Sequence, residues 1–417
     1  MTTRESNRPS FVAGFLFFLL FSGPPRFRER DPTASLRGEI DLVVIFHLAV
    51  WALAGMWVFY QMRFYFQANA KSLGLRLPQK LGLGMVAALG MSTFVSVSPP
   101  LTAFMVYQML ISLMFTMIFV ERYGVEACLT KLLQASAVMC VAIVVAAFAF
   151  SDLVLVTTET GATRLQGVYI ASTEVVSLFS LVLLLAGVQK ISKITYGLLL
   201  GLSCTLLVAS LSRTAYLAVF GIFLLVLFKR PTSKPFRRFA YIVGLAVVPL
   251  IALSSAFDLS KYRNPEGVWT LSDRLNLWAY LSHVTLQQSP WLGFGYYAGG
   301  RAYGIAYNAL LASPHSIFFE TFVGGGLLAI TILVILCVVM TAYVAHVFLR
   351  QDTSVCFAVT ILFLVTLMFG SVGSTLDSGP VAIVFWSLAA CLPILRNKGL
   401  ASARTAVTFR KELMEAR

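Results

Sequence analysis

Long apolar segments separated by short polar ones recur along the whole chain. Many of them approach the roughly 20 apolar residues with which an α-helix crosses a bilayer. Glycine, proline and charged residues stand between them, where helices end and turns form. The pattern predicts about twelve transmembrane helices, at 9–22, 40–60, 81–97, 101–120, 128–151, 167–188, 194–210, 215–228, 239–255, 316–349, 354–371 and 378–395.

One long hydrophilic connection interrupts this series. It lies between the ninth and tenth helices and is predicted to be a structured loop with short helices, because its pattern is locally helical and not low in complexity. The predicted units are 1–151 (N-terminal transmembrane helices), 152–255 (central transmembrane helices with an outer loop and a helix hairpin), 256–315 (the long loop), 316–395 (C-terminal transmembrane helices) and 396–417 (a basic tail).

The composition supports an all-α polytopic membrane protein. Hydrophobic residues make up 58% of the chain and charged residues 12%, and the mean hydropathy is +0.83. The net charge is +14, and the basic residues concentrate in the loops that share a side with both termini. By the positive-inside rule, that side is cytoplasmic and the long loop is periplasmic. The charge therefore needs no nucleic-acid partner.

An arginine stands between two of the apolar segments, in "LSRTAYLAVFG". Residues 194–228 would form a single helix of about 52 Å, whereas a bilayer core is about 30 Å thick. Two shorter helices with a turn at 210–214 fit better, and they place Arg213 at the outer membrane surface. There it either reaches toward lipid headgroups or binds an anion at the floor of a cavity.

The long loop contains its own helix signal. Thr270 and Asp273 have capping-box spacing, with Ser272 as an alternative N-cap, and a helical pattern follows. Arg274 and Trp278 share one face of this helix. Either the helix lies on the membrane surface with Trp278 in the headgroup layer, or Arg274 points into a cavity. The glycines of "PWLGFGYYAGGR" then allow the chain to approach another segment closely.

A histidine precedes the next long apolar helix, in "ASPHSIFFETFVGGGLLA". His315 is either an interfacial side chain or a group that transfers a proton, since an imidazole titrates near neutral pH. Glu320 is one turn further along. It could orient His315, accept a hydrogen bond from a sugar hydroxyl, or favour the helix N-terminus. Gly324–Gly326 are predicted to loosen or kink the helix.

Four arginines are predicted near outer helix ends: Arg164, Arg213, Arg274 and Arg301. The planar guanidinium matches phosphate oxygens, so a cluster of them at a membrane surface indicates a lipid-linked diphosphate as ligand. The outer loops contain few carboxylates, and no metal or other cofactor is expected. The six cysteines show neither a disulfide framework nor metal-ligand spacing.

Together these motifs resemble the O-antigen ligase-like superfamily. The resemblance rests on "RLQGVYIASTEV", "SRTA", "DRLNLW", "PWLGFGYY" and "PHSIFFETFVGGGLLA", in this order, and covers residues 160–335. The superfamily includes O-antigen ligases, Wzy-type O-antigen polymerases and exopolysaccharide polymerases. The resemblance does not decide between ligase and polymerase.

The resemblance implies a glycosyltransferase of the GT-C type in the bacterial inner membrane, with its site on the periplasmic side. The donor would be a glycan on undecaprenyl diphosphate, and the acceptor either lipid A–core or a second lipid-linked glycan. His315, Arg213 and Arg274 would be catalytic. Arg164, Arg301, Glu320 and Trp278 would bind the diphosphate or the glycan. The reaction would need no metal and would invert the anomeric centre.

Two other classes compete with this interpretation. A lipid-linked glycan transporter or flippase would also have many helices, but it would place its cations along a central cavity and not at outer helix ends. A non-catalytic partner in an envelope complex would tolerate loss of Arg213 and His315. Fold alone does not choose between these classes; the motifs favour the transferase.

Overall fold

The computed structural model describes residues 9–23, 31, 33–68, 75–157, 163–165, 173–210, 212–228, 274–308, 313–351, 353–373 and 375–415. These form α1 (Phe11–Ser22), α2 (Leu42–Ala68), α3 (Leu77–Met91), η1 (Ser92–Val95), α4 (Pro99–Ala149), α5 (Ser151–Val154), β1 (Leu155–Thr157), β2 (Thr163–Leu165), α6 (Thr173–Leu185), α7 (Lys193–Ala209), α8 (Arg213–Phe228), α11 (Arg274–Gln288), α12 (Ala298–Tyr307), α13 (Ile317–Arg350), α14 (Ser354–Gly373) and α15 (Gly379–Glu415).

The predicted apolar segments coincide with helices throughout the described part of the chain, while the segment 239–255 lies outside it. The predicted helices 101–120 and 128–151 are two arms of α4, which bends at Gly124, where φ is 88°. Among the described residues, five helices are long and apolar enough to cross a membrane: α2, α4, α13, α14 and α15. The chain is thus a polytopic helical protein of the predicted kind, and the number of twelve spans stays a prediction.

The first helix is shorter than a membrane span. Ser10 caps α1 by accepting a hydrogen bond from the Ala13 amide at 3.3 Å, and Gly23 ends it at φ 68°. Its 12 residues extend about 18 Å, well below the ~30 Å of a bilayer core. Helix α1 packs on α4, α15 and α2, with one face buried and the other exposed.

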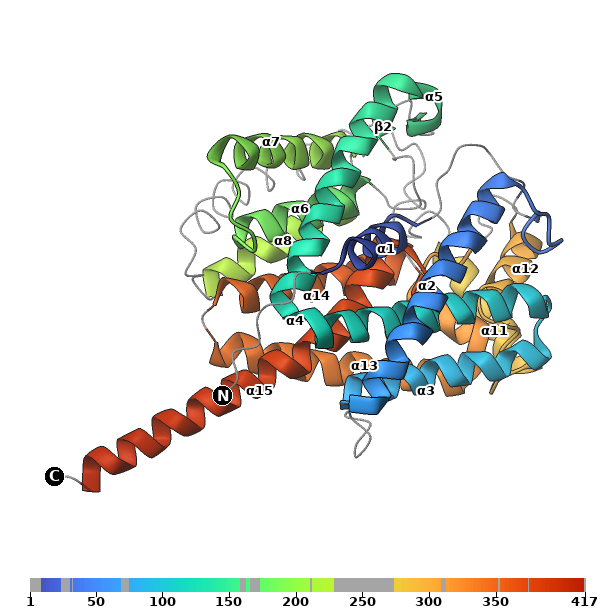
Figure 1. Cartoon of the computed structure of the whole chain (residues 1–417). Coiled ribbons are helices and arrows are strands. Elements are labelled where there is room, and N and C mark those ends of the chain that lie inside the picture. The colour runs from blue at the N-terminus through green and yellow to red at the C-terminus, as the bar shows by residue number, and fades with distance from the viewer. Residues whose placement is uncertain are drawn as a thin grey trace.

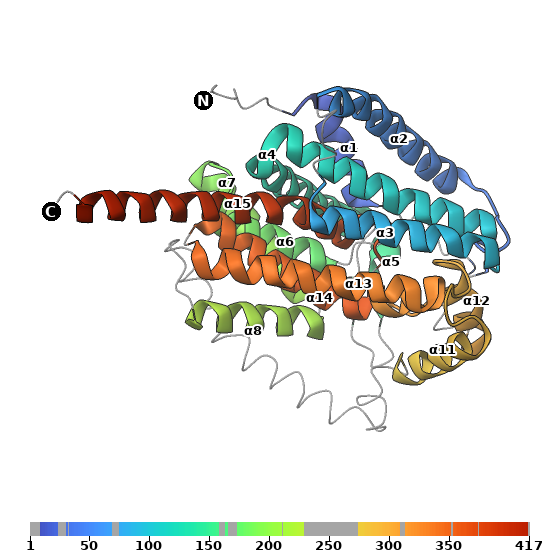
Figure 2. The ribbon, with the colours of Figure 1, turned by 90° about the horizontal axis from the view of Figure 1, so that it is seen from below.

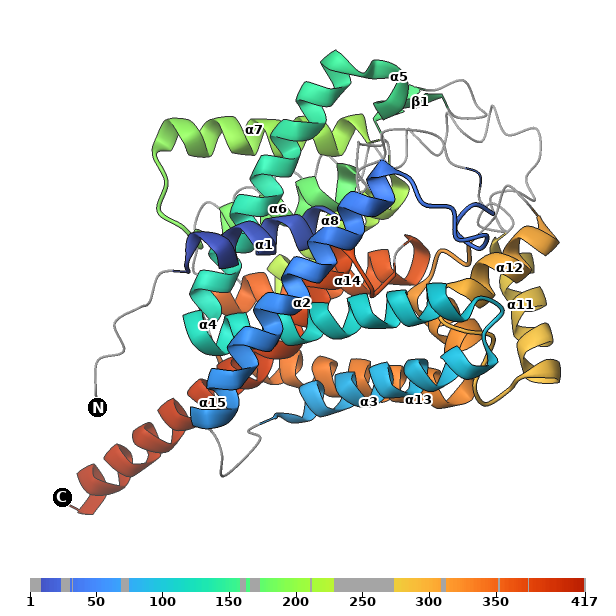
Figure 3. The same ribbon diagram turned by 45° about the vertical axis from the view of Figure 1, so that its right-hand side comes forward.

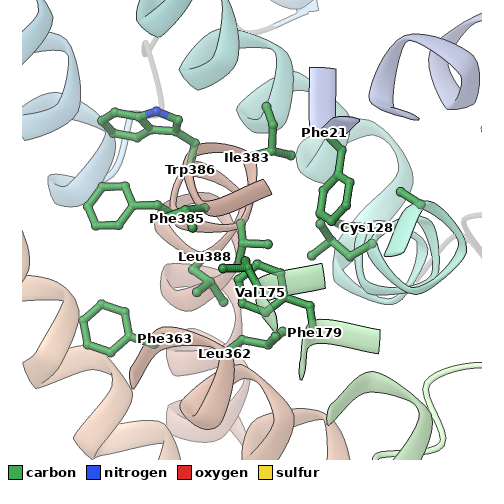
Figure 4. Packing of buried hydrophobic residues seen from close by; sticks show 14 of the residues in the cluster. Phe21, Cys128, Val175, Phe179, Leu362, Phe363, Ile383, Phe385, Trp386 and Leu388 are labelled. Atoms are coloured by element: carbon green, nitrogen blue, oxygen red, sulfur yellow. The ribbon is translucent and has the colours of Figure 1, made fainter. Parts of the chain in front are cut away.

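The core of the molecule is built around α15. Figure 4 shows side chains of α1, α4, α6 and α14, among them Phe21, Phe179 and Phe363, gathered around the α15 residues Ile383 and Leu388. All these side chains are almost completely buried. Residues of α15 beyond this core continue as a helix that projects away from the body (Figures 1 and 2). The close packing of these buried side chains holds in place the helices that carry the candidate site.

Helices α11 and α12 cover one end of the bundle. Helix α13 lies side by side with α3, and the first arm of α4 runs beside α3. At the end where α3 turns through η1 into α4, α11 and α12 pack on each other and on α13 (Figures 1 and 2). The predicted helix beginning near Arg274 is therefore confirmed as α11, while its proposed caps Thr270, Ser272 and Asp273 lie outside the described residues.

One segment departs from the all-α prediction. Strands β1 and β2 pair antiparallel, with Leu155 opposite Leu165 and Val156 opposite Arg164. Arg164 was predicted in an outer loop, whereas its backbone belongs to this short ribbon. The β-branched residues of the "LVT" and "TRL" strands fit an extended pairing.

Candidate active site

The site is organised by a break in helix α13. Gly326 has φ 64° and ψ −162°, so the helix is interrupted there, as the three-glycine run predicted. The segment 289–297 lies in this break. The Phe294 amide donates to the Val323 carbonyl at 2.9 Å, the Gly295 amide to the Gly324 carbonyl at 3.0 Å, and the Leu327 amide to the Pro290 carbonyl at 2.7 Å. Backbone groups released by the break thus find partners in another segment.

Glycine is required where these two backbones meet. Gly293 has φ 64°, and a Cβ there would collide with the Val323 carbonyl oxygen. A Cβ on Gly324 would lie 2.5 Å from the Tyr296 Cα, far inside normal contact distance. The predicted close approach of "WLGFGYY" to another segment is therefore confirmed, and the segment it approaches is the Gly324–Gly326 run of α13.

The turn between α3 and α4 holds the same segment from the other side. The Val97 amide donates to the Phe294 carbonyl at 3.1 Å. The Thr102 hydroxyl donates to the Tyr296 carbonyl at 3.2 Å, and the Tyr296 amide donates to Ser92 Oγ at 3.4 Å. Residues 289–297 are therefore held between α13 and the turn that joins α3 to α4. Such a clamp gives a rigid base for the side chains that follow it.

Tyr296 ties this base to the turn between α14 and α15. Its hydroxyl donates to Asp377 Oδ1 at 3.2 Å and accepts from the Leu376 amide at 3.3 Å. Burial, together with the carboxylates of Asp377 and Glu320, raises the pKa of Tyr296 well above its usual value. Tyr296 therefore remains a neutral hydrogen-bond donor. Asp377 is itself 3% exposed, and the Ser112 hydroxyl donates to its carbonyl at 3.0 Å.

Arg301 and Glu320 face each other across α12 and α13. Arg301 Nη1 lies 3.9 Å from Glu320 Oε1, and the side chains are 18% and 1% exposed. The Arg301 guanidinium also lies over the Tyr297 ring, 3.1 Å from its centroid. This cation–π contact stabilises the positive charge of Arg301. Arg301 Nη1 and both Glu320 oxygens are buried without a hydrogen-bond partner of normal geometry in the described part. The pair has room for further hydrogen bonds.

Trp278 connects α11 to the residue before His315. Its indole nitrogen donates to the Pro314 carbonyl at 2.7 Å. Its ring stacks on Phe319, with centroids 4.6 Å apart and 12° between the planes. His315 is half-buried and has φ 51°, an uncommon conformation for a residue with a side chain. The Trp278 hydrogen bond therefore fixes the backbone that gives His315 its direction.

The structure brings together five of the seven predicted site residues. Arg274 is half-buried at the first residue of α11, one turn before Trp278 on the same face. With Trp278, Arg301, His315 and Glu320 it belongs to the junction of α11, α12 and the start of α13. Contacts between residues far apart in the chain hold them there; one example is the hydrogen bond from the Trp278 indole to the Pro314 carbonyl.

Arg213 and Arg164 belong to other elements. Helices α7 and α8 are separated at 210–212, which confirms the predicted turn, and Arg213 is the first residue of α8. Helix α8 packs mainly on α14 and α6, and β2 contacts β1 and α7. Nothing is described of the side chains of either arginine. The cluster of four arginines therefore stays a prediction.

Three participants were not identified in the sequence: Tyr296, Tyr297 and Asp377. The "YY" pair stands inside a motif that was singled out for its glycines, and Asp377 is a single acid between two apolar helices. An isolated acid in such a place is a usable signal, because a buried carboxylate needs partners. Among the described residues no group of three or more histidine, cysteine or acidic side chains forms a metal site.

Comparison with known proteins bears on the same part of the chain. Residues 198–334 match a family model described as O-antigen ligase. The matched range contains Arg213, α11, α12, His315 and Glu320, and it ends within α13, just after the glycine break. No curated protein matches the chain. The family match confirms the resemblance to the O-antigen ligase-like superfamily.

Proposed function

We propose that this chain is a member of the O-antigen ligase-like superfamily, to whose family model residues 198–334 are similar, and that it is a membrane glycosyltransferase of surface polysaccharide assembly. It would transfer a glycan from undecaprenyl diphosphate to an acceptor hydroxyl. The observation that carries the proposal is the junction of α11, α12 and α13. Arg274 is the first residue of α11, Arg301 of α12 pairs with Glu320 of α13, and the Trp278 indole fixes the carbonyl of Pro314, directly before His315. The family match over residues 198–334 supports the same reaction class.

The proposed chemistry is a single displacement without a metal. The acceptor oxygen attacks the anomeric carbon, the bond from that carbon to the diphosphate oxygen breaks, and undecaprenyl diphosphate leaves. The acceptor proton passes to His315, acting as general base. Arg213 and Arg274 stabilise the charge that develops on the leaving diphosphate, with Arg164 in support. Attack from the face opposite the leaving group inverts the anomeric centre.

Arg301 and Glu320 have a supporting part in this proposal. Glu320 is completely buried, and its carboxylate lies 3.9 Å from the Arg301 guanidinium. The unfilled hydrogen-bonding positions of this pair are suited to a sugar hydroxyl that enters beside Arg301. Breaking a buried ion pair by removing one partner costs several kcal/mol in general, so the pair also keeps α12 against α13.

We place the protein in the bacterial inner membrane with both termini in the cytoplasm and α11–α12 on the periplasmic side. The distribution of basic residues supports this orientation. Among the described residues, five helices capable of crossing a membrane support the multi-pass location. The site then lies where lipid-linked sugars meet water.

The decisive experiment uses purified protein, undecaprenyl-diphosphate-linked glycan and two alternative acceptors. Glycan transferred to lipid A–core identifies a ligase; longer lipid-linked chains without core identify a polymerase. His315→Ala should abolish either product, whereas His283→Ala, an exposed residue of α11, should not. Absence of transfer with both acceptors, combined with movement of the lipid-linked glycan across a vesicle membrane, would replace the proposal with a flippase.

Trp278→Phe is expected to lower kcat by about ten-fold and leave KM little changed. Phenylalanine keeps the stack on Phe319 but cannot donate to the Pro314 carbonyl, so His315 loses part of its positioning. The effect is smaller than the ~100-fold that a misplacement near 1 Å costs. Trp291→Phe is the matched control, because Trp291 is 68% exposed. Equal kcat values for the two variants in the transfer assay would exclude a positioning role for Trp278.

A further inference from the structure

A cavity of about 340 Å³ lies between α1 and α2. Its walls are mostly apolar and include Phe18, Leu19, Val43, Phe46 and Val50. Figure 3 shows α2 crossing α1 at this place. The volume is at the lower end of the roughly 300–1,000 Å³ found for small-molecule sites. Leu42 and Phe46, on its rim, are 84% and 51% exposed, so the cavity opens sideways, toward lipid in a bilayer.

The polar side chains of His47 and Ser22 also line this cavity, and His47 is the titratable one. Trp51 Nε1 donates to His47 Nε2 at 3.1 Å, and the same nitrogen lies 2.7 Å from Gln108 Nε2. Because Nε2 accepts, the ring proton is on Nδ1. Nδ1 makes no hydrogen bond within the described residues. His47 is five residues after the start of α2, about 8 Å along the helix, which is near the depth where a lipid head joins its tail.

One end of the cavity lies against the first residue of α15, close in the chain to Asp377. At its end, Gly23 lies against Gly379, the first residue of α15: a Cβ on Gly23 would be 3.4 Å from the Gly379 Cα. Gln108, which contacts His47, is one turn before Ser112 on α4. Ser112 donates to the Asp377 carbonyl, and Asp377 holds Tyr296. Helix α4 therefore contacts both the cavity wall, through Gln108, and the base of the site, through Ser112.

We propose that this cavity binds the first isoprene units of the lipid donor, with the His47 Nδ1–H facing the oxygen that joins tail to diphosphate. The proposal rests on the proposed function, because it takes the donor to be a polyprenyl diphosphate. A lateral apolar opening receives the hydrocarbon without taking it out of the membrane. Gly379, which lies against Gly23 at the end of the cavity, is two residues after Asp377, so one molecule can extend from the cavity toward the Asp377–Tyr296 contact.

The direct test is photolabelling of the purified full-length protein. The probe is a polyprenyl diphosphate with a diazirine on its first isoprene units, and the labelled peptides are sequenced. Label is expected in α1 and α2, and excess undecaprenyl diphosphate should remove it while the same excess of phosphatidylglycerol should not. Label elsewhere, or equal competition by both lipids, which would mean ordinary lipid only, overturns the proposal. This readout requires no transferase activity, so it is independent of whether the proposed function holds.

A substitution that fills the cavity with a larger side chain gives a second test, read out as the KM for the lipid donor. Val43→Trp should raise KM for the undecaprenyl donor about ten-fold with kcat unchanged, which corresponds to the loss of roughly two buried CH₂ groups. Ile45→Trp is the matched control, because Ile45 is 52% exposed and lies outside the cavity wall. An unchanged KM in Val43→Trp, with both variants folded and active, rejects the cavity as the tail site and leaves the proposed function standing.

Discussion

Replacing Arg274 with alanine is expected to lower glycan transfer by two to three orders of magnitude, and Arg213→Ala to do the same. Removing one preorganised donor from a charge that develops in the transition state costs about that much in enzymes in general. The loss should appear in kcat, because the charge on the diphosphate grows as the glycosidic bond breaks. The measurement is steady-state transfer by purified protein, with the amount in the membrane determined for each variant.

Lysine variants separate charge from shape at the same positions. Lysine keeps the positive charge but loses the planar fork that contacts two phosphate oxygens, so Arg274→Lys should recover only part of the activity. Arg350→Ala is the control, since Arg350 is exposed at the opposite end of α13. Full activity of Arg274→Ala and Arg213→Ala, at normal levels in the membrane, would remove both residues from the proposed mechanism.

The order of helices could be predicted from hydropathy because each apolar segment is continuous in the chain. The break at 210–212 followed from length alone, since 35 residues exceed one membrane crossing. The division of α4 at the non-helical Gly124 agrees with the two predicted helices, but the sequence did not show that the two arms would meet at a sharp kink and not through a longer loop. The sequence "ERYGVE" is a polar interruption in an apolar pattern, and a bent helix and two helices with a loop give the same hydropathy profile.

The site could be predicted only as a set of separate motifs. Gly293 and Gly324 both indicated close backbone approach, but no local pattern paired them with each other. The contact of Tyr296 with Asp377 spans 81 residues, and it depends on how α13, α14 and α15 pack. Arg301 and Glu320 were each predicted to bind substrate. Their mutual approach follows from the seating of α12 on α13, where a Cβ on Gly300 would lie 3.0 Å from Glu320 Oε1.

Gly324→Ala is expected to destabilise the protein by about 1–3 kcal/mol, the usual cost of overpacking, and to abolish transfer. The new Cβ would lie 2.5 Å from the Tyr296 Cα and 3.0 Å from its nitrogen. These are backbone atoms, and Tyr296 is held by Ser92, Thr102 and Asp377. Segment 289–297 must therefore move away from α13, and α12 with Arg301 moves with it. Thermal unfolding in detergent and the transfer assay measure the two effects.

Gly84→Ala provides the matched substitution on α3, the helix that runs beside α13. A Cβ at Gly84 meets nothing within 4 Å, and alanine favours a helix by about 1 kcal/mol over glycine. This variant should unfold at the same or a higher temperature and keep its activity. A Gly324→Ala protein as stable and active as Gly84→Ala would contradict the docking of segment 289–297 into the break of α13. If Gly324→Ala were stable but inactive, the docking would matter for positioning Arg301 and His315 and not for folding.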